Sequence, residues 1–87
     1  MKSKINKVLS EIVKILSDND ESSWATYFKS CENQLDVDYQ VGIYNIRQVY
    51  RGMGSFNDLI LHKHGLPLQK ENDRLDQLRH ELYELSR

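Results

Sequence analysis

Residues 51–55 combine the residue types that bind an anion at the start of a helix. Gly52 and Gly54 stand one residue apart, Ser55 follows them, and Arg51 precedes them. Free backbone N–H groups at a helix N-terminus, together with the positive end of the helix dipole, can hold a phosphate or a carboxylate. A small-anion or nucleotide site at Arg51, Gly52, Gly54 and Ser55 is therefore one hypothesis for function.

The surroundings of this glycine pair favour a structural turn. A helix is expected before the glycine pair, whereas a phosphate-binding loop follows a strand. The lysine of a P-loop and the third glycine of a dinucleotide fingerprint are missing. Asp58 in the first turn would repel an anion, whereas Ser55 and Asp58 together suit a capping box. The glycines then end one helix and the serine starts the next.

The other reactive side chains lack partners for chemistry. His62 and His64 are two residues apart, which points them to different faces of a helix, and no carboxylate or cysteine completes a zinc set. The single cysteine, Cys31, excludes an internal disulfide and is expected to be a small buried hydrophobe. Ser55 with Asp58 is a cap, not a nucleophile with its base. We therefore expect no enzyme activity, no metal and no cofactor.

Acidic residues gather in the first half of the chain, although the net charge is only −1. Residues 11–38 hold seven acids against two lysines, whereas residues 39–70 hold four basic residues against Asp58. Such asymmetry can steer a charged partner, and solvated helix faces give the same pattern. The candidate contacts with a basic protein partner are Glu21, Glu32, Asp36 and Asp38.

Nucleic-acid and membrane functions are disfavoured. The segment that would serve as a recognition helix, residues 56–63, is apolar and carries one lysine. No run approaches the roughly 18 apolar residues of a membrane span. The basic N-terminus is not followed by the continuous apolar region of a signal peptide. We expect one cytoplasmic domain over residues 1–87.

Helices are predicted for the elements of the first half. Apolar residues recur with a period of 3.6 over residues 3–17, and four residues at steps of four, three and four form one face of a second helix over about 21–35. These four are Trp24, Phe28, Cys31 and Leu35. A third helix is predicted over about 39–50, with Gly42 at a close helix–helix contact. The β-branched and aromatic residues of 37–50 leave a strand as the alternative.

Two more helices complete an all-α, compact bundle of about five. A short one is predicted over about 56–63, with Phe56, Leu59 and Ile60 inward and Leu61 off to the side. The last runs over about 68–85. Its apolar seam fits packing inside a bundle or the contact of a homodimer. The seam residues are Leu75, Leu78 and Leu82, with Leu68 and Leu85 at its ends.

Residues 50–59 resemble the signature of a family of small bacterial helical proteins of uncharacterised function. Members carry a Gly-Gly-Met-Gly-Ser turn followed by a short Asn-Asp-Leu helix. The matching residues here are Gly52, Met53, Gly54, Ser55, Asn57, Asp58 and Leu59, while Arg51 replaces the first glycine. The likeness covers about residues 5–65. No established activity comes with it, and proteins of this size and kind are often encoded in toxin–immunity loci.

The resemblance and the acidic stretch together suggest a non-enzymatic protein-binding module of the immunity type. Such a protein would neutralise a basic toxin domain through its acidic face, with charge attraction speeding the association. The small-anion site and a homodimeric helical scaffold are the alternatives.

Overall fold

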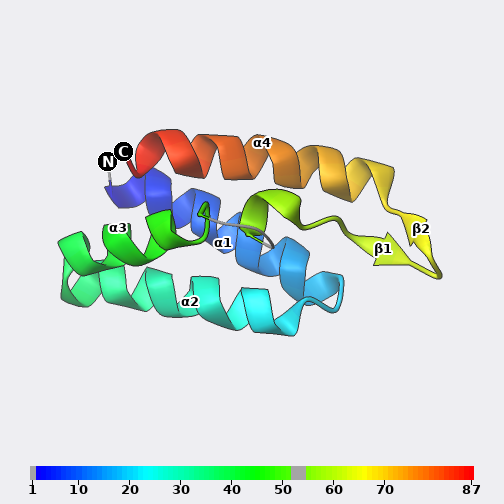
Figure 1. The fold of residues 1–87 in the computed structure, drawn as a ribbon. Helices are drawn as coiled ribbons and strands as arrows, with labels where there is room; N and C mark the ends of the chain where they lie inside the picture. Colours follow the sequence, from blue (N-terminus) through cyan, green and yellow to red (C-terminus); the bar gives the residue numbers. More distant parts are fainter. Residues whose placement is uncertain (1, 52–54) are drawn as a thin grey trace.

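The first predicted helix lies at the centre of the molecule, between the second helix and the last (Figure 1). The computed structural model describes residues 2–51 and 55–87. Within them lie four α-helices, one 3₁₀ helix and one hairpin: α1 (Lys2–Asp18), α2 (Ser22–Val37), α3 (Tyr39–Gln48), η1 (Phe56–Asp58), β1 (His62–Lys63), β2 (Leu66–Pro67) and α4 (Gln69–Leu85).

Helix α1 packs against α2 on one side and α4 on the other, and α3 packs on α2. Ile5, Leu9, Ile12 and Leu16 of α1 have no exposed surface, which follows from their spacing on one helical stripe. The chain thus encloses one core, whose buried apolar residues are Ile5, Val8, Leu9, Ile12, Leu16, Ala25, Phe28, Cys31, Leu35, Ile46, Val49, Phe56, Leu61, Leu75, Leu78 and Leu82.

The leucine seam of α4 is buried within this single chain. Leu75, Leu78 and Leu82 are each at most 1% exposed, and α4 packs on α1. Of the two roles that the sequence left open for this seam, packing inside a bundle and the contact of a homodimer, the structure shows the first. A homodimer through the same three side chains would require the bundle to open.

Helices α2 and α3 meet at a tight turn through Asp38. The Asp38 side chain accepts a hydrogen bond of 3.3 Å from the backbone N–H of Val41, which caps α3. The alternative of a strand over residues 37–50 is wrong, because Tyr39–Gln48 forms α3 with this cap at its start and Ile46 buried.

Gly42 is buried, and a Cβ built there would lie 2.6 Å from Leu35 Cδ2 and 2.9 Å from the Leu35 backbone nitrogen. The predicted close helix–helix contact is confirmed.

Replacing Gly42 with alanine is therefore expected to lower the free energy of unfolding by about 1–3 kcal/mol. Alanine favours a helix over glycine by up to about 1 kcal/mol, but its methyl group would press on the Leu35 backbone, which cannot rotate away. Chemical denaturation measures the change. The control is Gln40→Ala, at an exposed position of the same helix. A Gly42→Ala protein as stable as the control would contradict the close contact.

The helix predicted over residues 56–63 is wrong, and with it the count of five. Only Phe56–Asp58 is helical, as a single 3₁₀ turn, and the chain then continues extended. Leu61 is fully buried and Ile60 is 52% exposed, the reverse of their predicted positions. The fold is still mainly α-helical, with a small two-stranded sheet that the sequence analysis did not anticipate.

The hairpin follows from the residues His64 and Gly65. Both have positive φ, 54° and 78°, and they link the paired residues Lys63 and Leu66. Two consecutive residues with positive φ are the requirement of a type I′ turn, which matches the twist of antiparallel strands. Leu66–Pro67 then forms the return strand, β2. No helix among the described residues has the length and apolarity of a membrane span.

Candidate functional site

The four candidate acidic residues do not form one cluster. Glu21 precedes α2, whereas Asp36 and Asp38 lie at its other end, and 16 residues of helix separate them by about 24 Å. Glu32 faces α1, since its carboxylate accepts a hydrogen bond of 2.8 Å from Ser10 Oγ. Its other oxygen lies 3.7 Å from Lys29 Nζ, and only 15% of the Glu32 side chain is exposed. Asp36 and Asp38 therefore form the acidic group at the α2–α3 end.

Exposed apolar side chains lie beside these two aspartates. Val37 is 83% exposed, Val41 40% and Tyr44 62%. Val41 is tied to Asp38 by the cap hydrogen bond, and Tyr44 lies one turn further on the same face of α3. We call Asp36, Val37, Asp38, Val41 and Tyr44 the α2–α3 corner. It combines a large exposed aromatic ring, two aliphatic side chains and two carboxylates.

A shallow groove lies between α2 and the C-terminal half of α3. Its cavity volume is about 330 Å³, and its lining residues are Ser23, Trp24, Tyr27, Gln48 and Val49. The Tyr27 hydroxyl donates a hydrogen bond of 2.8 Å to the Asn45 carbonyl, which fixes the ring across the two helices. Gln48 follows Tyr44 by four residues, so the groove continues along the face of α3 that carries the corner.

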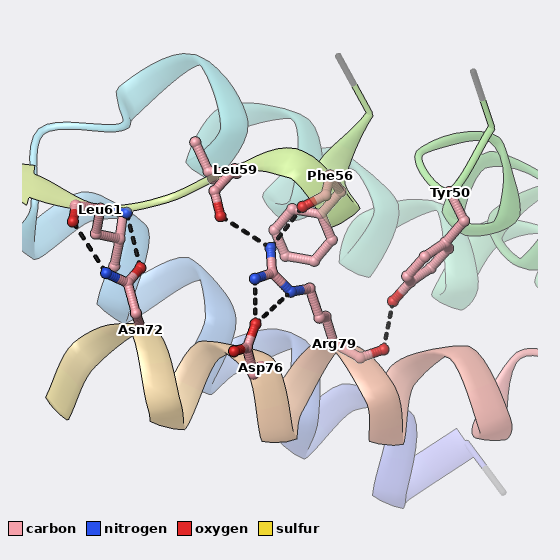
Figure 2. Close-up of polar contacts among 7 residues, drawn as sticks. All are labelled: Tyr50, Phe56, Leu59, Leu61, Asn72, Asp76 and Arg79. Atoms are coloured by element: carbon pink, nitrogen blue, oxygen red, sulfur yellow. Dashed lines mark hydrogen bonds and ion pairs between the residues drawn. The ribbon is translucent and has the colours of Figure 1, made fainter. Parts of the chain in front are cut away.

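A network centred on Arg79 joins α4 to the segment after α3 (Figure 2). The Arg79 Nη1 group donates to the carbonyls of Phe56, at 2.6 Å, and Leu59, at 3.0 Å. The Nε and Nη2 groups both donate to the same oxygen of Asp76. The guanidinium also stacks on the Phe56 ring, 5.5 Å from its centroid. Arg79 is thus occupied in holding the 3₁₀ turn.

Two more contacts in Figure 2 fix the chain on either side of that turn. Asn72 Nδ2 donates to the Leu61 carbonyl at 3.0 Å, and Asn72 Oδ1 accepts from the Leu61 N–H at 2.7 Å. The Tyr50 hydroxyl donates to the Arg79 carbonyl at 2.7 Å, and burial raises the pKa of Tyr50, which keeps the donor protonated. Asn72 and Arg79 could not be identified from the sequence, because their partners are backbone groups 11–23 residues away.

A cavity of about 540 Å³ lies over this network. It is lined by Tyr50, Asn57, Asp76, Arg79, His80 and Tyr83. The N–H groups of Arg79 donate to two backbone carbonyls and to Asp76. The guanidinium that lines the cavity therefore stabilises the fold and is already engaged by protein groups.

The residues of the predicted anion site are only partly described. Gly52 and Gly54 lie outside the described residues. Arg51 is exposed, whereas Ser55 is buried and, among the described residues, its side chain makes no cap to η1. The predicted capping box is thus wrong for the Ser55 side chain. The helix expected after Ser55 is a three-residue 3₁₀ turn, which offers an anion few N–H groups and little dipole.

Cys31 is a buried free thiol, as predicted, and burial raises its pKa to about 11. The thiolate is the nucleophile, so at pH 8 alkylation of the native protein by iodoacetamide is expected to be about a hundredfold slower than that of the denatured chain. Mass spectrometry of quenched samples measures both rates. Equal rates would show that the thiol is accessible.

Within residues 2–51 and 55–87, no three His, Cys, Asp or Glu side chains gather as metal ligands would.

Comparison with protein families gives one match. A family model described as a domain of unknown function (DUF6966) matches residues 17–69, more than half of the chain. A family of uncharacterised function, the coarser part of the expected resemblance, is thereby confirmed. Neither a curated protein nor a solved structure matches the chain.

Proposed function

We propose that this chain, which belongs to the DUF6966 family, is a non-enzymatic protein-binding module whose contact surface is the α2–α3 corner. The observation that carries the proposal is the exposure of Tyr44, Val41 and Val37 within residues 36–44, the stretch that also holds the exposed Asp36 and Asp38. Aromatic anchors surrounded by polar residues are typical of the centre of protein interfaces.

The corner has the parts that binding requires. Tyr44 brings a large rigid ring with few rotatable bonds, so little entropy is lost when it is immobilised. The cap from Asp38 to Val41 fixes the start of α3 and therefore orders the surface before a partner arrives. The adjoining groove, with Trp24 and Tyr27 in its wall, would accept an apolar side chain of the same partner.

The carboxylates of the corner specify the charge of the partner. Asp36 and Asp38 are both exposed, so their field reaches solvent and would attract a basic surface during encounter. Glu21 lies one turn before Trp24 and adds a negative charge at the far end of the groove. We propose an immunity-type role in the bacterial cytoplasm, in which the corner covers the basic surface of a toxin domain.

The test is a titration, by isothermal calorimetry, of the full chain against the protein encoded by the neighbouring gene. Tyr44→Ala is expected to weaken the complex at least about tenfold, because it removes the apolar anchor. Asp36→Lys is expected mainly to slow association, and the loss should shrink at high salt. Asp73→Lys, an exposed position on α4, is the matched control. Equal affinity for Tyr44→Ala, Asp36→Lys and wild type would exclude the corner.

A further inference from the structure

The β1–β2 hairpin is a second exposed surface, and the fold holds it firmly. Leu61, at its base, is fully buried and bonded through both its N–H and its carbonyl to Asn72. The Leu61 carbonyl also accepts a hydrogen bond of 3.0 Å from the N–H of Leu68, on the other arm. The type I′ turn closes the tip at His64 and Gly65. The hairpin is therefore pre-ordered, which lowers the entropy cost of binding.

This hairpin exposes apolar side chains together with positive charge. Leu66 is 69% exposed and pairs with Lys63, so both side chains share one face, while Pro67 lies on the other face opposite His62. Ile60 is 52% exposed just before β1. Residues 59–70 contain two lysines, two histidines and no acid. Its chemistry is thus the complement of the α2–α3 corner, where apolar side chains stand beside two aspartates.

The two surfaces lie at opposite ends of the same molecule. Figure 1 shows the hairpin projecting beyond the N-terminal end of α4, whereas the turn between α2 and α3 lies at the far end of the bundle. The molecule is 39 Å long and 24 Å and 20 Å across. A hairpin therefore cannot reach the corner of its own chain, but it can reach the corner of another.

We propose that the hairpin of one copy docks on the α2–α3 corner of a second copy, so that the chain associates head to tail. Leu66 would pack against Tyr44 and Val41, with Lys63 close to Asp36 and Asp38. Such a contact is heterologous and leaves a free hairpin at one end and a free corner at the other, so it propagates. Because the hairpin tip is small, the association is weak and reversible. The proposal rests on the proposed partner surface, for which a second copy and the partner would compete.

Sedimentation velocity on the full chain over a range of concentrations tests this, with two variants that each block one surface. Leu66→Asp removes the apolar tip and Tyr44→Asp adds a charge to the corner, and both positions are exposed, so the fold should be kept. The sedimentation coefficient of wild type should rise with concentration, and the average mass derived from it should exceed that of a dimer. Each variant alone should self-associate at least about tenfold more weakly than wild type. Thr26→Asp, exposed on α2 away from both surfaces, should behave as wild type.

The decisive measurement is the mixture of the two variants. Tyr44→Asp keeps an intact hairpin and Leu66→Asp keeps an intact corner, so they should pair one to one and stop at a dimer. A wild type that stays monomeric, or a mixture that stays monomeric, overturns the proposal. Leu66→Asp should still bind the neighbouring gene's product as wild type does, because that surface is untouched. Failure of self-association is thereby distinguished from failure of the proposed function.

Discussion

Replacing Arg79 with methionine is expected to lower the free energy of unfolding by about 3 kcal/mol. The side chain is 11% exposed, and its Nη1 group satisfies the carbonyls of both Phe56 and Leu59. Methionine keeps much of the packing but leaves two part-buried carbonyls without their charged donor, and each such loss costs about 1–3 kcal/mol. The contact with Asp76 adds little, because that carboxylate is 61% exposed.

Denaturant unfolding followed by the fluorescence of Trp24, the single tryptophan, measures the effect. The matched control is Arg74→Met on the same helix, where the arginine pairs with Glu11 at 2.6 Å but both side chains are more than 40% exposed. That surface pair should contribute at most about 1 kcal/mol. Arg79→Lys should recover only part of the loss, since an ammonium group cannot bridge two carbonyls and Asp76 with the guanidinium's fork of donors. A loss for Arg79→Met no larger than the control's would show that the clamp is not stabilising.

Replacing Phe56 with alanine is expected to cost about 3–5 kcal/mol. The ring is fully buried at the centre of an aromatic cluster, with centroids 4.7 Å from Phe28, 5.4 Å from Trp24 and 6.1 Å from Tyr50. Alanine leaves a cavity and also removes the ring on which Arg79 stacks.

Phe56→Leu should cost clearly less than Phe56→Ala, because most of the volume is kept. Ile60→Ala, at a 52% exposed position in the same segment, should change the free energy of unfolding by less than about 0.5 kcal/mol. Thermal or denaturant unfolding compares the three. If Phe56→Ala and Ile60→Ala were equally stable, residues 55–61 would not be part of the core.

The helices could be predicted from the sequence because their apolar stripes are regular. The apolar residues that recur every 3.6 positions over residues 3–17 form the buried face of α1. Phe28, Cys31 and Leu35 form the buried face of α2 in the same way. The role of Gly42 could also be predicted, since a glycine inside a helix costs stability unless a neighbour needs the space. In these elements the local pattern and the tertiary packing agree.

Residues 56–63 show where local pattern fails. Phe56, Leu59 and Ile60 have helical spacing, yet the chain turns once and extends, because Arg79 and Asn72 supply donors to its carbonyls from α4. Once Leu59 and Leu61 carbonyls are satisfied in this way, a helix is not needed to pair them. Leu61 then faces the core, and Ile60 faces solvent.

The candidate site was partly accessible to the same reasoning. Asp36 and Asp38 could be identified from the charge distribution, and the cap by Asp38 from its place before a helix. Tyr44 was not identified as a contact residue, although the spacing of Ile43 and Ile46 places them on the buried side of α3 and the Tyr44 ring is exposed. Glu32 was assigned by charge alone, and its bond to Ser10 depends on how α1 and α2 cross.

The position of α1 between α2 and α4 has a consequence for the boundaries of the folding unit. Among the residues that the structure describes, half of the sixteen buried apolar side chains lie outside residues 17–69, on α1 and α4. The region by which the family is identified therefore holds the α2–α3 corner and the hairpin but lacks α1, which packs on α2, and α4, which packs on α1. A fragment of residues 17–69 should fail to fold, while in the full chain the amides of α1 should exchange with solvent only through global unfolding.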